Sequence, residues 1–528
     1  MVVLRTLLVG AAVAGLLVAG LAAAALLAWP HVGFAPSEDG LTHVSLPGFA
    51  GRVAAVEVSA VGAPVAVRLH GGTVSPLRPL PAGERLSVAV TVQRPRWIGW
   101  LVGRSEVRST TVAAPEARVV QPSLAPRQGE RVRVRFDRPV SVVSIDGGPA
   151  RRLARPREVV SLGVVARGTT SAGTMKVAAA VRPWEQLSAP VRVSWFVPQP
   201  RVQLLADPEP GSTIAPRPRL TLTFSLPVEK ALGSGRPRLV PAMPGRWRQL
   251  DGHTLVFQPR GLGFGLGATL QLRLPRPALL AGGKGAPPRR VLHWQVVGGS
   301  MLRLQQLLAK LGYLPLRWQP AADPADSPRA ELAAAVSPPA GRFSWRYPHT
   351  PAALRQLWRA GRQNLVTQGA IMAFENAHGL PVDGLAGPNL WRALLEDALA
   401  GKPYRGGYSY VFVHLSVPES LNLWHDGRVI VRSPSNTGVP GAPTELGTWP
   451  VFEHIPVGTM SGTNLDGSHY EDPGIQYISY FHGGDAIHAF DRASYGTPQS
   501  LGCVELPLAA AGEVWPYTPI GTLVTIEN

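Results

Sequence analysis

The chain has 528 residues, 45% of them hydrophobic, with 57 Gly and 53 Pro. This length exceeds one ordinary domain and the composition excludes a disordered chain, so we expect four or five folded modules joined by turns. The net charge is +18, yet residues 404–528 hold four Arg, no Lys and twelve Asp and Glu, a net charge of −8. The last module is therefore acidic while the rest of the chain is basic, and the two parts are expected to interact with differently charged molecules.

The basic part shows no helix-turn-helix, zinc-finger or aromatic-basic RNA motif, so nucleic acid is not an expected partner. Outside the cytoplasm, the anions available to it are phospholipid head groups and anionic wall polymers. A solvated arginine-rich surface without a partner explains the charge equally well.

The N-terminus carries an uncharged apolar run from Leu7 to Trp29, long enough to span a bilayer. Arg5 precedes the run and the next basic residue is Arg52, which predicts that the N-terminus stays inside and the rest is exported. We expect residues 1–30 to be an uncleaved transmembrane anchor, which makes the chain a single-pass cell-membrane protein facing the wall. The small residues 22–25 leave a cleaved signal peptide, and hence a secreted protein, as the alternative.

Residues 40–297 read as short alternating strands broken by Pro and Gly, for example at 53–58, 131–136 and 220–224. Regular short strands with frequent turns predict β-sandwiches. Breaks near Ala114–Pro115 and Pro198–Pro200 divide the region into modules at 40–114, 115–198 and 199–299. In the third module, the pattern resembles that of bacterial Ig-like domains at residues 207–211, 220–224, Trp247 and 254–259. We expect all three modules to act as structural spacers that position the rest of the chain, without catalytic activity of their own.

From Ser300 the apolar period becomes helical: Leu304, Leu307, Leu308 and Leu311 share a face that ends at Gly312. A second helical stretch covers 351–378 and a third covers 391–399, with an Asp-Gly turn between them. These pieces resemble the three-helix peptidoglycan-binding module, here placed at 300–402. A long Pro/Ala-rich insertion at 320–341 departs from that pattern, so a helical spacer that no longer binds glycan is the alternative.

The last module, 404–528, returns to strands. Strands at 409–415 and 428–432 flank the turn at Asp426–Gly427. Two further turns follow, Asn436-Thr437-Gly438 and Pro443 to Thr448, then His488 on a strand and the segment Ser500-Leu501-Gly502-Cys503-Val504.

Cys503 is the only cysteine, so it has no disulfide partner. Its Ser-x-Gly-Cys setting, fifteen residues after His488, supplies a nucleophile and a candidate base. A free thiol is mostly protonated near neutrality, so it needs a base that takes its proton. Gly502 lets the backbone approach a substrate, and the N–H groups of Gly502 and Cys503 are candidate oxyanion donors. Ser500 either orients the site or closes the turn.

Taken in this order, the motifs resemble the L,D-transpeptidase catalytic domain of the YkuD type. The resemblance implies a β-sandwich in which Cys503 is the nucleophile, and His488 is the base with its second nitrogen held by a backbone carbonyl. It further implies substrate contacts from Phe481, His482, Thr444 and Gly447, and neither cofactor nor metal. His482 is the rival base, while His454 and His469 fall in the loop that forms the lid in relatives.

Two positions depart from the family pattern: Leu501 replaces a frequent His, and Glu505 replaces a frequent Arg or Asn. The whole chain is thus expected to be a multidomain, mainly β, exported enzyme that forms 3→3 peptidoglycan cross-links between stem peptides through a cysteine thioester. The alternatives are an L,D-carboxypeptidase or a wall-protein anchoring enzyme with the same thioester, and a non-catalytic wall-binding scaffold.

Overall fold

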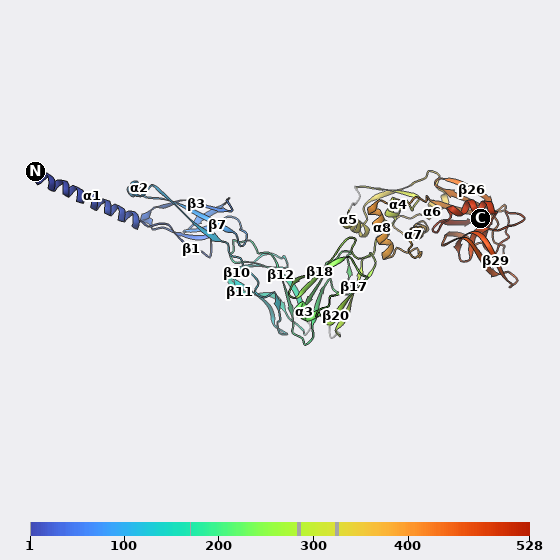
Figure 1. Cartoon of the computed structure of the whole chain (residues 1–528), viewed down its shortest axis with the longest axis horizontal. Helices are drawn as coiled ribbons and strands as arrows, with labels where there is room; N and C mark the ends of the chain where they lie inside the picture. Colours follow the sequence, from blue (N-terminus) through green and yellow to red (C-terminus); the bar gives the residue numbers. More distant parts are fainter. Residues whose placement is uncertain (1, 169–170, 282–286, 323–326) are drawn as a thin grey trace. The chain divides into compact units, whose positions relative to one another are not determined.

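The computed structural model describes residues 2–168, 171–281, 287–322 and 327–528, and their side chains except at 2–9, 25–27 and 101–102. The chain divides into two compact units (elements labelled in Figure 1). One contains residues 1–205, 223–231 and 277–289, and the other contains residues 206–222, 232–276 and 290–528. The helical module and the last β domain therefore belong to the same unit.

The apolar run at the N-terminus forms helix α1, Val2–Ala28. Ala and Leu dominate it, and both are strong helix formers. In the described part of the chain we find no helix that combines the length and the apolar character of a membrane span. The predicted anchor, residues 1–30, includes side chains that lie outside that description.

The first β module consists of two four-stranded sheets, ordered β1-β2-β6-β5 and β4-β3-β7-β8. Alternate residues of β7 point inward, and they meet Val44 and Val74 of the other sheet in one core. Two sheets around one core make a sandwich, as the strand pattern predicts. The elements are β1 (Gly33–Ala35), β2 (Thr42–Ser45), β3 (Arg52–Ala60), β4 (Ala63–Val65), β5 (Val67–His70), β6 (Thr73–Pro76), β7 (Arg85–Gln93), helix α2 (Arg96–Val102) and β8 (Ser105–Ala113).

The second β module is one five-stranded sheet, ordered β11-β10-β12-β13-β9, rather than the two sheets that a sandwich requires. Its strands β10 and β11 have 15 residues each, and register shifts between them bend the sheet around its core. The strand predicted at 131–136 is the first half of β10. The strands are β9 (Ser123–Leu124), β10 (Arg131–Ile145), β11 (Arg151–Val165), β12 (Ala172–Ala180) and β13 (Val191–Phe196).

In the third β module, the predicted strand 220–224 is found with those bounds, as β16, and the segment 254–259 of the Ig-like resemblance forms β19. Trp247 of β18 packs on Phe257 of β19, with ring centroids 5.3 Å apart. The Ig-like assignment stays a prediction. The elements are β14 (Gln203–Asp207), β15 (Thr213–Ile214), β16 (Leu220–Phe224), α3 (Val228–Leu232), β17 (Arg238–Val240), β18 (Gly245–Asp251), β19 (Thr254–Pro259), β20 (Thr269–Leu280) and β21 (Arg289–Val296).

The helical module begins with α4, which ends at Gly312 in a left-handed conformation, as predicted. The stretch 351–378 is two helices rather than one, because the chain turns at Gly361 and Asn364 caps a new helix by accepting from Thr367 N–H at 3.0 Å. The helices are α4 (Met301–Leu311), α5 (Pro328–Val336), α6 (Ala352–Leu357), α7 (Leu365–Ala377) and α8 (Pro388–Ala400).

The described part of the insertion in this module contains regular secondary structure. Strands β22 (Leu316–Pro320) and β23 (Gly341–Trp345) pair with each other, and α5 lies between them in sequence. A buried ion pair of 2.7 Å between Arg303 of α4 and Glu331 of α5 ties the insertion to the first helix. Helical spacing alone could not reveal this long-range partner.

The last domain packs two sheets around a common core. One has the order β26-β25-β24-β32-β27 and the other β28-β29-β30-β31. The turn at Asp426–Gly427 is found, but the strand directly before it is β25, a strand that the sequence pattern missed. The elements are β24 (Ser409–His414), β25 (Ser420–His425), β26 (Arg428–Pro434), β27 (Gly447–Pro450), β28 (Glu453–Thr463), β29 (His469–His482), β30 (Asp485–Ala489), β31 (Val504–Leu506), α9 (Leu508–Val514) and β32 (Leu523–Glu527).

The helical module and this domain share one hydrophobic core. Leu308 and Phe374 of the helices belong to the same buried cluster as Tyr410, Trp424 and Leu523 of the β domain. The two parts also meet backbone to backbone: a Cβ atom on Gly369 of α7 would lie 2.4 Å from the carbonyl oxygen of Gly521. This junction fixes the β domain on the helical module.

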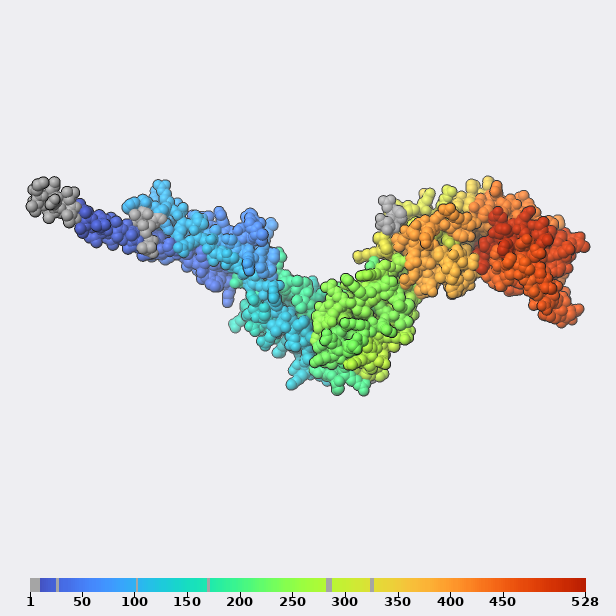
Figure 2. Space-filling view, viewed as in Figure 1, coloured from blue at the N-terminus to red at the C-terminus, as the bar shows by residue number. Residues whose placement is uncertain are grey.

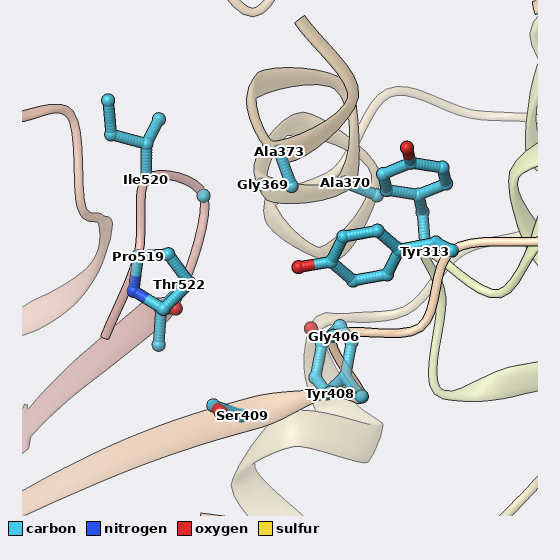
Figure 3. A pocket seen from close by; sticks show the side chains of 13 residues that line it. Tyr313, Gly369, Ala370, Ala373, Gly406, Tyr408, Ser409, Pro519, Ile520 and Thr522 are labelled. Atoms are coloured by element: carbon cyan, nitrogen blue, oxygen red, sulfur yellow. The ribbon is translucent and has the colours of Figure 1, made fainter. Parts of the chain in front are cut away.

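A small cavity lies at this junction (Figure 3). Gly369, Ala370 and Ala373 line it from α7, and the 519–522 loop lines it from the β domain. His488 and Cys503 do not line it, so the candidate catalytic site lies elsewhere.

Candidate active site

The parallel pairing of β30 with β31 brings the predicted base and nucleophile together. Ile487 pairs with Val504 and His488 pairs with Glu505, so Cys503, one residue before β31, comes beside Ala486. Ala486 and His488 lie on one face of β30, since strand side chains alternate. This register brings the backbone of Cys503 close to that of His488, with Cys503 just before the residue that pairs with Ile487.

His488 is held in one orientation. Its side chain is buried, and Nδ1 lies 3.0 Å from the carbonyl oxygen of Ala489. A carbonyl only accepts, so Nδ1 carries the proton and Nε2 is left as the basic nitrogen. Burial lowers the pKa of His488, more than Glu505 raises it, so the imidazole is neutral near pH 7.

Cys503 is equally neutral. Burial raises the pKa of its thiol to about 12, and the carboxylates of Asp485 and Glu505 act in the same direction. The thiol donates weakly to the carbonyl oxygen of Gly484, at 3.8 Å. A neutral thiol beside a neutral imidazole calls for proton transfer during attack rather than a preformed thiolate.

The loop before Cys503 is fastened by hydroxyl groups. Ser500 Oγ donates to the carbonyl oxygen of Cys503 at 2.6 Å and accepts from Gly502 N–H at 3.2 Å. Thr444 Oγ1 donates to the carbonyl oxygen of Gly502 at 2.8 Å and accepts from Gly438 N–H at 2.9 Å. Both side chains are buried, so Ser500 orients the loop and Thr444, predicted to contact substrate, supports it.

Gly502 has no room for a side chain. Its φ is +118°, and a Cβ atom there would lie 2.2 Å from Asp485 Oδ1. Its N–H is already engaged by Ser500, which leaves the Cys503 amide as the oxyanion donor that we predict from this pair.

The Asn-Thr-Gly turn frames the same loop, and an unpredicted carboxylate holds it. Asn436 exchanges two backbone hydrogen bonds with Glu505, of 3.0 and 2.9 Å, and Ser500 N–H donates to Thr437. Glu419 is buried and accepts from both the N–H and the hydroxyl of Thr437, each at 2.7 Å. Burial raises the pKa of Glu419, against these hydrogen bonds. Nothing in the sequence around Glu419 signalled this role.

The remaining predicted substrate residues lie on the other side of the loop. His482 Nδ1 is 3.6 Å from Asp485 Oδ2, and its ring packs on Trp449 at 4.1 Å between centroids. His482 is 37% exposed, so it remains available to a ligand. Gly447 begins β27 next to Trp449, whereas Phe481 is buried in the core, where packing accounts for it.

Glu505 is paired, which sequence analysis did not foresee. Arg492 donates to it through Nε at 2.8 Å and Nη2 at 2.7 Å, and its guanidinium lies 4.5 Å from the centre of the Phe490 ring. Glu505 is 5% exposed and Arg492 is 31% exposed. The charge of Glu505, the residue that departs from the family pattern, is thus neutralised by Arg492. This ion pair lies beside His488, which pairs with Glu505 across the two strands.

The segment predicted as a lid loop is a long hairpin of β28 and β29. Burial, and secondarily Cys503, raise the pKa of Tyr470 and Tyr480. Tyr480 and Cys503 pack against the same small apolar cluster. At the tip, Leu465 reaches Gly441, on which a Cβ atom would lie 2.9 Å from Leu465 Cδ1. His454, which the resemblance places in the lid loop, stacks on Trp515 with ring centroids 4.1 Å apart, while His469 is exposed.

Among the residues that the structure describes, no group of three or more His, Cys, Asp or Glu could hold a metal ion.

Comparison with known families matches residues 409–526 to the L,D-transpeptidase catalytic domain model, named YkuD. Residues 409–526 are an L,D-transpeptidase catalytic domain. Residues 360–394 match the peptidoglycan binding domain model, so the catalytic domain is preceded by a peptidoglycan-binding domain. That match overlaps the predicted second and third helical stretches without covering either in full, and it leaves out the insertion. A comparison with curated proteins gave no match.

Solved L,D-transpeptidases are similar to parts of the chain. One from Mycobacterium smegmatis has 12% identity and a TM-score of 0.22, covering 62% of this chain and 99% of its own. The catalytic domain of the Enterococcus faecium enzyme has 29% identity and a TM-score of 0.21, covering 22% and 95%. L,D-transpeptidase 3 from Mycobacterium tuberculosis, with a faropenem-derived adduct, has 13% identity and a TM-score of 0.21, covering 61% and 97%. At these TM-scores the assignment rests on the family models.

Proposed function

We propose that this chain is an exported L,D-transpeptidase that cross-links peptidoglycan through a thioester on Cys503. The observation that supports the proposal is the register of β30 and β31, which brings the chain at Cys503 close to His488, whose Nδ1 lies 3.0 Å from a backbone carbonyl oxygen. It lies within the residues that match the catalytic domain model.

In the first half-reaction, Cys503 Sγ attacks the carbonyl carbon of the third residue of a donor stem tetrapeptide. The thiol proton passes to His488 Nε2, and the Cys503 amide donates to the oxyanion. The carbon–nitrogen bond to the terminal D-alanine then breaks, and its amine takes the proton from His488. The product is a thioester and free D-alanine.

In the second half-reaction, the side-chain amine of a second stem attacks the thioester. His488 Nε2 takes a proton from that amine, the carbon–sulfur bond breaks, and the thiolate recovers the proton from His488. A 3→3 cross-link results. With water as the acceptor the same steps give a carboxypeptidase, and with a wall-protein amine they give an anchoring enzyme.

We also propose that the bulk of the chain faces the wall and is held at the cell membrane by residues 1–30. The uncharged run 7–29, with Arg5 before it, supports that orientation. The β modules then keep the catalytic domain away from the bilayer, and the peptidoglycan-binding domain keeps it on the polymer. Anionic wall polymers are proposed partners of the basic modules.

The decisive experiment is the intact mass of the full chain after incubation with a carbapenem, with Cys503→Ala alongside. A β-lactam acylates an activated nucleophile at an acyl-transfer site, so we expect one adduct on the wild type and none on the variant. Incubation with stem tetrapeptides should then release D-alanine and yield cross-linked dimers. A folded wild type that takes no adduct would contradict the proposal, and hydrolysed tripeptide without dimer would establish the carboxypeptidase.

A further inference from the structure

An exposed aromatic group at one end of the first β module has no role in the proposed chemistry. Phe49 is 65% exposed, Trp97 is 65% exposed and Trp100 is 79% exposed. We call these three side chains the aromatic cap. Soluble domains seldom leave several large rings in water side by side, and such clusters mark interaction sites.

The cap is held in place rather than loose. Trp29 is 9% exposed and packs edge-on against Phe49 and Trp97, with centroids 6.4 and 5.6 Å apart. The indole N–H of Trp100 donates to the carbonyl oxygen of Trp97 at 2.9 Å. The rings therefore present a fixed apolar surface with a satisfied polar atom.

The cap adjoins the apolar N-terminal helix. Trp29 comes directly after α1, and α1 and α2 are in contact. Figure 1 shows α2 beside the carboxyl-terminal part of α1, and Figure 2 shows the blue surface of the first module bordering that helix. Whatever surrounds the end of α1 also meets the cap.

The charges around the cap are basic. Arg96 and Arg104, which flank the two tryptophans in sequence, are exposed. The nearby carboxylate of Glu106 is engaged by Arg94 at 2.7 Å and by Arg108 at 2.9 Å. This end of the module thus carries rings bordered by exposed guanidinium groups, which complement anionic lipid head groups.

We propose that the aromatic cap inserts into the head-group layer of an anionic bilayer, so that the first β module docks on the membrane surface. Trp prefers this layer because its body is apolar and its edge is polar. The docking contact is separate from the span itself and orients the module on the bilayer. It rests on the proposed export, since the cap must face the outer leaflet.

The test uses tryptophan quenching by lipids brominated in the acyl chains. The full chain is reconstituted in vesicles of phosphatidylglycerol and phosphatidylcholine with and without bromine. We expect strong quenching of the wild type and loss of most of it in W97F/W100F, which keeps the rings apolar but removes both indoles. Trp247, in the third β module, gives the matched control: W247F should leave the quenching unchanged.

The charge contribution is measured in the same vesicles. At low salt, we expect R96Q/R104Q to be quenched less than the wild type in vesicles that contain phosphatidylglycerol. In vesicles of phosphatidylcholine alone, the difference between this variant and the wild type should be smaller. W97S/W100S should undock the module while carbapenem acylation of Cys503 stays at the wild-type level, which shows that the catalytic domain is unaffected.

Three outcomes separate the possibilities. Equal quenching in wild type and W97F/W100F would overturn the docking proposal, because the signal would then come from other indoles. Without lipid, the tryptophans of the cap could become less accessible to a water-soluble quencher as the protein concentration rises. That result would overturn the proposal in favour of a second copy of the chain as the occupant of the cap. If residues 1–30 prove to be cleaved, quenching of Trp97 and Trp100 on added vesicles would still support docking, while the anchor proposal would fail.

Discussion

The protonation states of two residues set how the site responds to pH. His488 must be neutral to accept the thiol proton, and burial holds its pKa below the usual value near 6.5. Cys503 stays protonated far above neutrality, with a pKa of about 12. We expect the carbapenem acylation rate to fall as pH drops through the lowered His488 pKa and to stay flat from pH 7 to 9. A rate that climbs steadily across pH 7–9 would indicate thiolate titration instead.

The ion pair beside the base gives a second prediction. Glu505→Gln leaves the Arg492 charge without its partner, at a cost of about 1–3 kcal/mol, since Arg492 is partly exposed. Because Glu505 raises and Arg492 lowers the pKa of His488, the acid limb of the acylation profile should move to lower pH. The matched control is Glu513→Gln, an exposed glutamate on α9 that should change neither the profile nor the stability.

At the residue scale, the sequence identified the candidate nucleophile and base but not the residues that hold the surrounding segments in place. Cys503 and His488 stand in recognisable motifs, and they remain the predicted pair. Glu419 and Arg492 lie 18 residues before Thr437 and 13 before Glu505, the residues they hold. Such contacts depend on the return path of the chain, which local patterns do not encode.

At the scale of elements, the loop before Cys503 depends on hydroxyl groups rather than on a strand. Ser500→Ala removes two hydrogen bonds, worth about 1 kcal/mol each at most positions. We expect acylation to slow roughly tenfold with little change in melting temperature. Stopped-flow acylation measures the effect. Ser494→Ala serves as control in the same segment, and an equal slowing there would argue against a specific role of Ser500.

The lid hairpin shows why some elements escape sequence patterns. Strand β28 contains Pro456, Gly458 and Gly462, which read as turn residues rather than as strand. Its pairing with β29 supplies the order that local propensity lacks. The second β module also differs from its sequence pattern. One bent five-stranded sheet encloses its core, where the pattern predicts two packed sheets.

At the scale of the whole molecule, the peptidoglycan-binding and catalytic domains should unfold together, because their cores are continuous. Gly369→Val places a branched side chain against the Gly521 carbonyl and should cost about 1–3 kcal/mol by overpacking. We expect carbapenem acylation to be lost at a lower temperature, although the change lies in the other domain. Gly387→Ala, at a position with open space and a φ of −73°, controls for glycine replacement in the same module.

The order of modules along the chain was predictable because the apolar period changes from strand to helix and back. Where one module ends and the next begins was harder to see, since the boundary near residue 403 separates two motifs but not two cores.

That continuous core also limits how this enzyme can be divided. A fragment starting at Tyr404 would uncover Tyr408, Tyr410 and Trp424, which the helices now shield. We expect such a fragment to aggregate and to be unstable. Proteolysis near residue 403 should therefore inactivate the catalytic domain rather than release it in active form. Exchange of catalytic domains between wall enzymes would therefore have to carry the helices along.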